Sequence, residues 1–343
     1  MKIISPALTF DDVLLTPQYS DIHSRKEIDI GSDLDKNTHL SLPIISAPMD
    51  TVTEVKTAIA INCAGGLGII HRYNSIKEQA SMVSKTANTS IVGAAIGATG
   101  DFIDRATAVH DAGANILCID IAHGHHILAK HAIAKLKEVF GDRIHIMVGN
   151  VATAEGFKAL ESWGANSIKV GIGGGSICST RIQTGHGMPT LQSIFDINEW
   201  VPHRQATLIA DGGIRTSGDI VKALAAGADF VMLGSMLAGT EESPGEMIMN
   251  ATGGNRRKVY RGMASKEAQM DWHGRFSSNE GVATTIPYKG KLEDTLEDLR
   301  NGIRSGLSYS GVRTVKELQQ GALFVKQTLA GQIESSTHIT RIN

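Results

Sequence analysis

Cysteine is scarce in this chain: three residues, Cys63, Cys118 and Cys178, are scattered over 343 positions. Such spacing excludes the disulfide framework of a small secreted domain and is typical of a protein kept in a reducing compartment. We therefore expect a cytoplasmic protein.

Net charge and long apolar runs are also lacking. The formal net charge is −2, and no stretch approaches the roughly 18 consecutive apolar residues of a membrane span. Asp11 and Asp12 interrupt the apolar N-terminal residues, which excludes a signal peptide. The composition therefore indicates neither a nucleic-acid nor a membrane partner, and a small-molecule substrate is expected. Aromatic residues make up only 5%, whereas glycine occurs 37 times, which suits many tight turns.

Eight short apolar runs alternate with segments whose apolar residues recur at helical spacing. The runs are Pro43–Pro48, Gly66–Ile70, Ile91–Gly97, Asn115–Ala122, His145–Val151, Ser167–Ile172, Leu208–Gly213 and Phe230–Ser235. Apolar strands alternating with helices indicate a parallel sheet buried on both faces, and eight such units predict an α/β (β/α)₈ TIM barrel. A doubly wound open sheet is the alternative, but no strand is followed by a GxGxxG turn that opens a helix.

The helical segments have recognisable ends. His126–Phe140 and Ala154–Trp163 carry apolar residues at helical spacing, and Thr153 and Thr216 are candidate N-caps. A Gly-Ala-(Asn/Asp) sequence recurs at 113–115, 164–166 and 227–229, where a helix would lead into a strand. Three matching joints support a repeated unit.

The sixth run leads into a glycine-rich loop, Gly171-Ile-Gly-Gly-Gly-Ser-Ile-Cys-Ser-Thr180. Its glycines allow sharp turns and a close approach to a ligand, and its amides and hydroxyls can cradle an anion. Cys178 lies among polar residues rather than in an apolar run, which favours a nucleophile, and Thr180 is near enough to handle a proton. A flexible loop with an incidental cysteine is the alternative.

Barrel enzymes carry their chemistry where the strands end at the carboxyl face. The polar or reactive residues that follow these strands are Ser46 and Met49, Asp120 and His123, Asn150, the cysteine loop, Asp211-Gly212-Gly213, and Gly234-Ser235. The last two groups, with Ser176, predict a phosphate site built from the sixth to eighth loops.

The residues after the eighth strand do not close the barrel at once. Thr240–Gly290 is long, polar and weakly periodic, which predicts an active-site flap of the single domain 1–343; disorder is the alternative. Leu292–Ser305 and Val315–Thr328 are then expected to be helices.

Several motifs resemble the inosine monophosphate dehydrogenase/guanosine monophosphate reductase family. Besides the cysteine loop, they are 8–15 (LTFDDVLL), 46–53 (SAPMDTVT), 66–71 (GLGIIH), 210–215 (ADGGIR), 260–263 (YRGM) and 286–290 (IPYKG). The resemblance covers nearly all of the chain. It implies a (β/α)₈ barrel, a homotetramer, and a loop cysteine that attacks purine C2 to form a covalent thioimidate.

The resemblance also implies roles for individual residues. The catalytic group would be Cys178, Thr180 as a proton carrier and Glu280 at the purine edge. The substrate would contact Ser46, Met49, Ser176, Asp211, Gly212, Gly213, Gly234, Ser235, Arg261, Gly262, Met263 and Gly281. The cofactor would contact Ser24, Arg25, Asp120, Ile121, Ala122, Ile172, Gly173, Ser305 and Ser308. A monovalent cation such as K⁺ would be held by backbone carbonyls of Gly173, Gly175, Cys178 and Arg181.

Four features are similar to the reductase branch of the family. Residues 262–275 lack the Arg-Tyr pair of the dehydrogenase flap, and no regulatory tandem domain is inserted between Arg72 and Ile91. Ser24-Arg25 and 183–189 (QTGHGMP) are similar to reductase motifs. This implies NADPH-dependent conversion of GMP to IMP and ammonia. A dehydrogenase without the regulatory domain, converting IMP to XMP with NAD, and a non-catalytic nucleotide-binding relative are the alternatives.

Three positions depart from the reductase pattern. Gly174 stands where proline is common, Ser179 replaces threonine and His123 replaces asparagine. The glycine should loosen the catalytic loop.

Other interpretations explain less of the sequence. Lys169 on the sixth strand could form a Schiff base in an aldolase-like lyase, but this leaves Cys178 unexplained. The histidines at 123, 125, 126 and 131 lack metal-site spacing. Cys63 and Cys118 are expected in the core.

Overall fold

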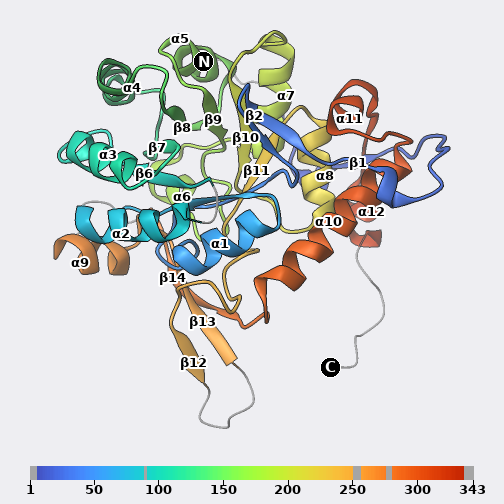
Figure 1. The fold of residues 1–343 in the computed structure, drawn as a ribbon. Helices are drawn as coiled ribbons and strands as arrows, with labels where there is room; N and C mark the ends of the chain where they lie inside the picture. Colours follow the sequence, from blue (N-terminus) through green and yellow to red (C-terminus); the bar gives the residue numbers. More distant parts are fainter. Residues whose placement is uncertain (1–5, 89–90, 250–255, 276–279, 336–343) are drawn as a thin grey trace.

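A closed barrel of eight parallel strands forms the body of the protein (Figure 1). The computed structural model describes residues 6–88, 91–249, 256–275 and 280–335. The barrel strands are β4 (Ile44–Ser46), β5 (Leu67–Ile70), β6 (Gly93–Ile96), β7 (Ile116–Asp120), β8 (His145–Val151), β9 (Ser167–Val170), β10 (Thr207–Asp211) and β11 (Phe230–Leu233). They follow chain order, and β11 closes against β4. The predicted (β/α)₈ architecture is confirmed.

Helices cover the outside of the barrel between the strands (Figure 1). They are α1 (Val55–Cys63), α2 (Ile76–Ala87), α3 (Phe102–Asp111), α4 (Ile127–Phe140), α5 (Ala154–Ser162), α7 (Thr190–Trp200), α8 (Ser217–Ala225) and α10 (Leu292–Tyr309). The short helix α6 (Thr180–Thr184) belongs instead to the loop that follows β9. Thr153 and Thr216 accept hydrogen bonds from the first turns of α5 and α8, as predicted. Gly113, Gly164 and Gly227 have φ of 106°, 106° and 117°, which confirms the three helix-to-strand joints because glycine alone adopts such angles freely.

The apolar core has two layers. Alternate strand residues, such as Ile168 and Val170, pack against the helices. The others fill the barrel interior, among them Cys118, which is fully buried as predicted. Cys63 does not follow this prediction, because it ends α1 on the outside and is exposed. No helix in the described ranges is long and apolar enough to cross a membrane.

Described segments that precede and follow the barrel pair with each other. Before the barrel come η1 (Phe10–Asp12), β1 (Val13–Leu15), η2 (Arg25–Glu27), β2 (Ser32–Asp35) and β3 (Thr38–Leu40); after α10 come α11 (Val315–Gly321), β15 (Phe324–Lys326) and α12 (Leu329–Glu334). The predicted helix over Val315–Thr328 is therefore wrong beyond Gly321. There the β-forming Phe324 and Val325 pair with β1 instead, a tertiary contact that overrides local periodicity.

The polar stretch 240–290 contains regular structure that its weak periodicity did not reveal. It holds β12 (Met247–Met249), β13 (Arg256–Arg261), α9 (Lys266–His273) and β14 (Ala283–Pro287). The three strands form an antiparallel sheet that projects from the barrel (Figure 1). Ser277 and Ser278, within the expected flap, lie outside the described residues.

A polar network fixes the β2–β3 hairpin to the amino end of the barrel. His145, the first residue of β8, contacts Asp35 Oδ2 through Nδ1 at 2.6 Å and Ser167 Oγ through Nε2 at 2.8 Å. Thr207, the first residue of β10, donates to the Leu34 carbonyl at 2.8 Å. Ser167 is fully buried, so this Asp-His-Ser arrangement has no access to substrate and is structural. The hydrogen bond from His145 lowers the pKa of Asp35 to about 2.

Replacing Asp35 by Asn should lower the free energy of unfolding at pH 7 by about 1–2 kcal/mol, because the carboxylate partner of His145 is lost. A depressed carboxyl pKa contributes stability above its unfolded value of about 4, and that contribution disappears as the pH falls toward 2. The difference between wild type and Asp35→Asn in urea unfolding should therefore shrink below pH 4. Asp33→Asn, in the same hairpin but with an exposed partner, is the control and should change stability by less than about 0.5 kcal/mol. Equal effects of both variants would contradict this account.

Candidate active site

The loop after β9 packs so closely on the loop after β10 that it requires glycine. A Cβ on Gly171, whose φ is 143°, would lie 1.9 Å from the carbonyl oxygen of Asp211. A Cβ on Gly212, with φ of 92°, would lie 3.0 Å from the amide nitrogen of Gly175. Because no side chain fits between them, the two loops hold their backbones together and turn residues 173–178 toward the barrel axis.

Residues 280–282, far along the chain, complete this loop by backbone pairing. The Ser179 amide donates to the Glu280 carbonyl at 3.0 Å, and the Val282 amide donates to the Ile177 carbonyl at 3.0 Å. Cys178 and Gly281 form an antiparallel bridge between these two bonds. The cysteine is thus presented by a short two-stranded ladder, and its neighbours are fixed.

Cys178, Thr180 and Glu280 form one hydrogen-bonded chain. The Cys178 thiol donates to Thr180 Oγ1 at 3.2 Å, and the Thr180 hydroxyl donates to Glu280 Oε2 at 2.8 Å. The three side chains are partly buried. A proton leaving the thiol therefore has a continuous path to a carboxylate, which is the arrangement that activates a nucleophile.

A cavity of about 450 Å³ lies over these residues at the carboxyl ends of the strands. It brings together all three predicted catalytic residues and most predicted contacts. The predicted substrate residues that line it are Met49, Ser176, Asp211, Gly212, Gly213, Gly234, Ser235, Gly262, Met263 and Gly281. The predicted cofactor residues that line it are Asp120, Ile121, Ala122, Ile172 and Gly173.

One end of this cavity is rich in hydroxyls. Ser176 Oγ lies 3.4 Å from the hydroxyl of Tyr260, which reaches in from β13. A Cβ on Gly234 would lie 3.2 Å from the same hydroxyl, so the glycine makes room for the tyrosine. Burial raises the pKa of Tyr260 and keeps its hydroxyl a hydrogen-bond donor. Tyr260 belongs to the sequence motif 260–263, but that motif does not indicate its contact with Ser176, which lies 84 residues away.

A buried ion network forms the floor of the cavity. Lys169 Nζ lies 2.5 Å from Asp120 Oδ1 and 3.7 Å from Asp211 Oδ2. Burial favours a neutral lysine, but the two carboxylates outweigh it and raise the pKa of Lys169. Burial also opposes ionisation of Asp120, yet Lys169 and Arg72 lower its pKa overall. For Asp211 burial prevails over Lys169 and Asn150, and its pKa is raised.

Six predicted contacts lie away from this cavity. Ser46 is fully buried and accepts a hydrogen bond from Thr53, so it supports the cavity wall from behind. Arg261 points the other way, toward Asp50 at 2.6 Å and Asp271 at 2.5 Å. The remaining four, Ser24, Arg25, Ser305 and Ser308, belong to η2, its N-cap and α10, which contact one another. Ser305 lines a separate cavity of about 420 Å³.

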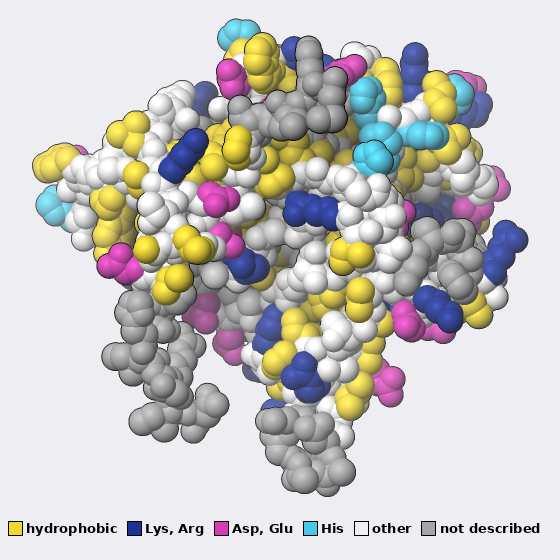
Figure 2. All heavy atoms as spheres, turned by 180° about the vertical axis from the view of Figure 1, so that it is seen from behind, with side chains coloured by type: hydrophobic (Ala, Val, Ile, Leu, Met, Phe, Trp, Pro, Cys, Tyr) yellow, Lys and Arg dark blue, Asp and Glu magenta, His cyan; other side chains and the backbone are white. Residues whose placement is uncertain are grey.

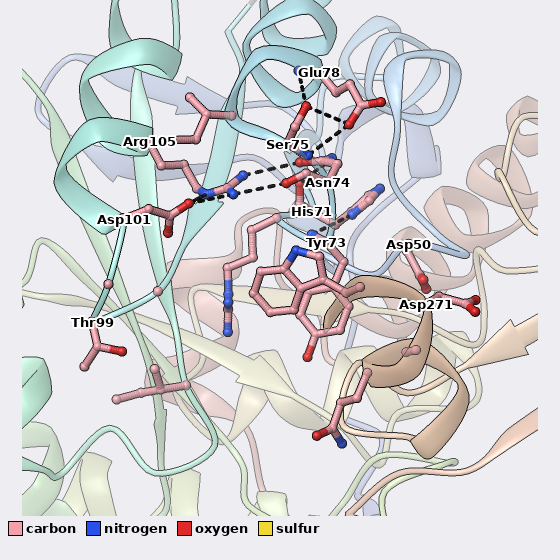
Figure 3. Close-up of a pocket in the computed structure, with 18 of the residues that line it drawn as sticks. Asp50, His71, Tyr73, Asn74, Ser75, Glu78, Thr99, Asp101, Arg105 and Asp271 are labelled. Atoms are coloured by element: carbon pink, nitrogen blue, oxygen red, sulfur yellow. Dashed lines mark hydrogen bonds and ion pairs between the residues drawn. The ribbon is translucent and has the colours of Figure 1, made fainter. Parts of the chain in front are cut away.

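A second, larger cavity of about 1310 Å³ adjoins the first and shares Arg72, Tyr73 and Ile121 with it. Figure 3 shows Tyr73 at its centre, with Asp271 on one side and Asp101 and Thr99 on the other. Trp272 of α9 stacks on Tyr73 with ring centroids 4.1 Å apart, and the Arg72 guanidinium lies over both rings. No periodic pattern indicates this wall, because Tyr73 and Trp272 are about 200 positions apart.

The histidine cluster and the loop of the predicted cation site both bear on ion binding. No group of three or more His, Cys, Asp or Glu residues in the described ranges is arranged to hold a metal ion. The histidines gather on one face beside α4 (Figure 2), and His123 and His125 contact edge to face. In the predicted cation loop, the Gly175 carbonyl accepts the Cys178 amide and the Arg181 carbonyl accepts the Gly185 amide. These carbonyls are already hydrogen-bonded, and the cation site stays a prediction.

Comparison with known proteins agrees with this geometry. Residues 7–338 match the IMP dehydrogenase / GMP reductase domain family. The inosine-5'-monophosphate dehydrogenase of Nitrosopumilus maritimus is 34% identical over 96% of this chain and 98% of its own length. The GMP reductase of Leishmania major is 32% identical over 98% of each chain. A GMP reductase from Trypanosoma brucei, solved in complex with guanosine 5'-monophosphate, superposes with a TM-score of 0.93 at 30% identity, over 98% of this chain and 99% of that chain.

The relatives also correct one sequence argument. The alignments with the Nitrosopumilus and Leishmania proteins extend over 468 and 485 positions, more than the 343 residues of this chain. Both a dehydrogenase and a reductase therefore contain residues that this chain lacks, and the missing insertion does not separate the two branches. What the match does decide is broader: the chain belongs to the IMP dehydrogenase/GMP reductase family, whose members are oxidoreductases of purine metabolism that use a nicotinamide cofactor.

Proposed function

We propose that this protein is a GMP reductase, which converts GMP and NADPH to IMP, ammonia and NADP⁺. The observation that carries the proposal is the hydrogen-bonded chain from Cys178 through Thr180 to Glu280 at a nucleotide-sized cavity. A thiol supplies the nucleophile, and the hydroxyl and carboxylate supply a route for its proton.

The hydrogen bonds from Cys178 through Thr180 to Glu280 account for the proton transfers of the first step. The Cys178 thiol passes its proton along Thr180 to Glu280 and, as thiolate, forms a bond to purine C2. The same proton returns through Thr180 to the 2-amino group, whose C–N bond breaks as ammonia leaves. The cofactor, when bound, supplies a hydride to C2. The C2–S bond then breaks, Cys178 departs as thiolate, and a proton from water restores the thiol.

The nucleotide would lie with its base over Cys178 and its phosphate at the hydroxyl-rich end. Asp211, at the end of β10, would accept hydrogen bonds from the ribose hydroxyls. Ser176, Ser235 and the backbone amides of Gly213 and Gly234 would hold the phosphate, and Tyr260 would donate a further hydrogen bond.

The dinucleotide would extend from Asp120, Ile121 and Ala122 into the larger cavity, which opens directly from the first. Ser24, Arg25, Ser305 and Ser308 do not line either of these cavities. They would contact a cofactor only across an interface with another copy, which is the reason to propose a homotetramer.

The branch assignment rests on the residues between β13 and β14. Described residues 262–275 carry no adjacent Arg-Tyr pair to activate water, and Arg261 is engaged by Asp50 and Asp271. Without that pair, release of ammonia and hydride transfer to C2 is the favoured outcome. IMP dehydrogenase is the second candidate, because a dehydrogenase matches this chain at 34% identity and a reductase at 32%.

The proposal predicts a fall in reduced-nicotinamide absorbance with GMP and NADPH, and no rise with IMP and NAD⁺. Cys178→Ala should abolish turnover while GMP binding, measured by calorimetry, is retained, since the phosphate and ribose contacts remain. A rise with IMP and NAD⁺ alone would make the protein a dehydrogenase. Nucleotide binding without turnover in either reaction would favour the non-catalytic relative.

Thr180→Val should reduce kcat by about 10²–10⁴, because the hydroxyl that links Cys178 to Glu280 is removed with little change in shape. Ammonia release should slow more than hydride transfer in single-turnover measurements. Thr184→Val is the matched control: its hydroxyl donates to the Thr180 carbonyl on the exposed side of α6, away from the thiol. Equal slowing of both steps would remove the specific role of Thr180.

Trp272→Ala should raise the KM for NADPH about tenfold, because loss of the stack on Tyr73 removes one wall of the larger cavity. The KM for GMP should stay within about twofold. Trp272→Phe preserves a stacking ring and should restore most of the affinity. An equal rise in both KM values would place the cofactor elsewhere.

A further inference from the structure

Lys169 contacts carboxylates on both sides of the candidate active site. It belongs to β9, with Asp120 on β7 and Asp211 on β10. Its side chain is only 2% exposed, while those of Asp120 and Asp211 are 27% and 23% exposed. The ammonium therefore lies beneath two carboxylates that both open into the cavity.

The reach of Lys169 to Asp120 depends on the intervening strand. Asp120, Gly149 and Lys169 are register neighbours on β7, β8 and β9. A Cβ on Gly149 would lie 2.5 Å from Lys169 Cβ and 3.0 Å from its Cε. The missing side chain on β8 is what lets the lysine stem cross that strand and place Nζ 2.5 Å from Asp120 Oδ1.

Asp211 shares the same ammonium more weakly, at 3.7 Å, and its Oδ2 also accepts a hydrogen bond from Asn150 at 2.9 Å. One positive charge thus faces two negative charges, so a change at either carboxylate alters the attraction available to the other. The other titratable groups around this network are Arg72, Tyr73, Cys118 and Tyr260.

From this geometry we propose that Lys169 is a positioning residue that couples the nucleotide and cofactor ends of the active site through its shared contacts with Asp211 and Asp120. The inference rests on the proposed function only in taking Asp211 as a ribose contact and Asp120 as a cofactor contact. Lys169 favours the ionised form of both carboxylates and orients them, and its nearly buried side chain acts on the ligands through them. Loss of the charge of Asp120 then strengthens the Lys169–Asp211 attraction, although Asp120 does not contact the nucleotide.

The test is the pH dependence of GMP and IMP binding, measured by calorimetry between pH 4.5 and 8 without cofactor. Asp211 accepts ribose hydroxyls fully only when ionised, so affinity should fall at low pH. Lys169→Met should move the midpoint of this fall up by about one pH unit, because the cation that favours ionised Asp211 is gone. Asp120→Asn should move the midpoint to lower pH, because Lys169 then interacts with the Asp211 carboxylate alone. Lys169→Arg should restore the wild-type midpoint.

Lys258→Met is the matched control for loss of a buried ammonium. Lys258 is 5% exposed and donates to the carbonyls of Thr240 and Ser243 at the base of the projecting sheet, outside the cavity. It should lower stability and leave the midpoint unchanged. Ionisation of the ligand phosphate affects all variants alike and cancels in the comparison.

The outcomes separate the two proposals. Opposite shifts in Lys169→Met and Asp120→Asn support the coupling. An unmoved midpoint in Asp120→Asn, or an equal shift in Lys258→Met, overturns it while the proposed function stands. If Lys169→Met does not fold, Asp120→Asn decides alone, since it replaces one partly exposed carboxylate by an amide of the same shape. Failure of wild type to bind either nucleotide would overturn the proposed function instead.

Discussion

The backbone ladder between the cysteine loop and residues 280–282 is the contact on which the active site depends. Two amide hydrogen bonds of 3.0 Å join segments about 100 positions apart, and they bring Glu280 to the Thr180 hydroxyl. Without them the loop would still turn at its glycines, but the thiol would have no carboxylate behind it. The sheet and helix between β11 and α10 therefore serve a chemical purpose: they return the chain to the barrel at residue 280.

Electrostatics imposes a second constraint, because the barrel floor buries an ammonium that could not stay charged alone. Transfer of a lone cation into such an interior is strongly unfavourable, and nearby carboxylates offset that cost. The carboxylates of Asp120 and Asp211 offset the cost of burying the Lys169 ammonium. Both carboxylates face the space where a nucleotide and a cofactor would meet under the proposed function. The same three charged groups, Lys169, Asp120 and Asp211, therefore stabilise the barrel interior and line the candidate active site.

Under the proposed function, the two reactions of the family would share a covalent intermediate on Cys178 and would differ in how that intermediate is resolved. That choice depends on what reaches C2: a hydride or an activated water. In this chain α9 packs its tryptophan against Tyr73 at the entrance between the two cavities. Both rings line the larger cavity, through which the cofactor would approach C2 under the proposed function.

Much of this protein could be predicted from the order of its residues. The eight apolar runs and the Gly-Ala-(Asn/Asp) joints specify local structure and a repeated unit, and repetition of strand and helix leaves the closed parallel barrel as the compact solution. Strand ends then point to the carboxyl face, so Cys178, Asp120 and Asp211 could be assigned to one site. These inferences depend on neighbours in sequence or on a regular repeat, which is why they succeeded.

The remainder depends on contacts between distant segments, about which local pattern carries no information. Phe324 and Val325 became a strand because β1 offered unpaired backbone, Arg261 turned away from the substrate cavity because Asp50 and Asp271 attract it, and Ser46 was closed off by Thr53. The sequence by itself determined the barrel and indicated Cys178 as its candidate nucleophile. Only the tertiary structure decided which hydroxyl, carboxylate and ammonium surround that nucleophile, because such partners are selected by packing and charge across the fold.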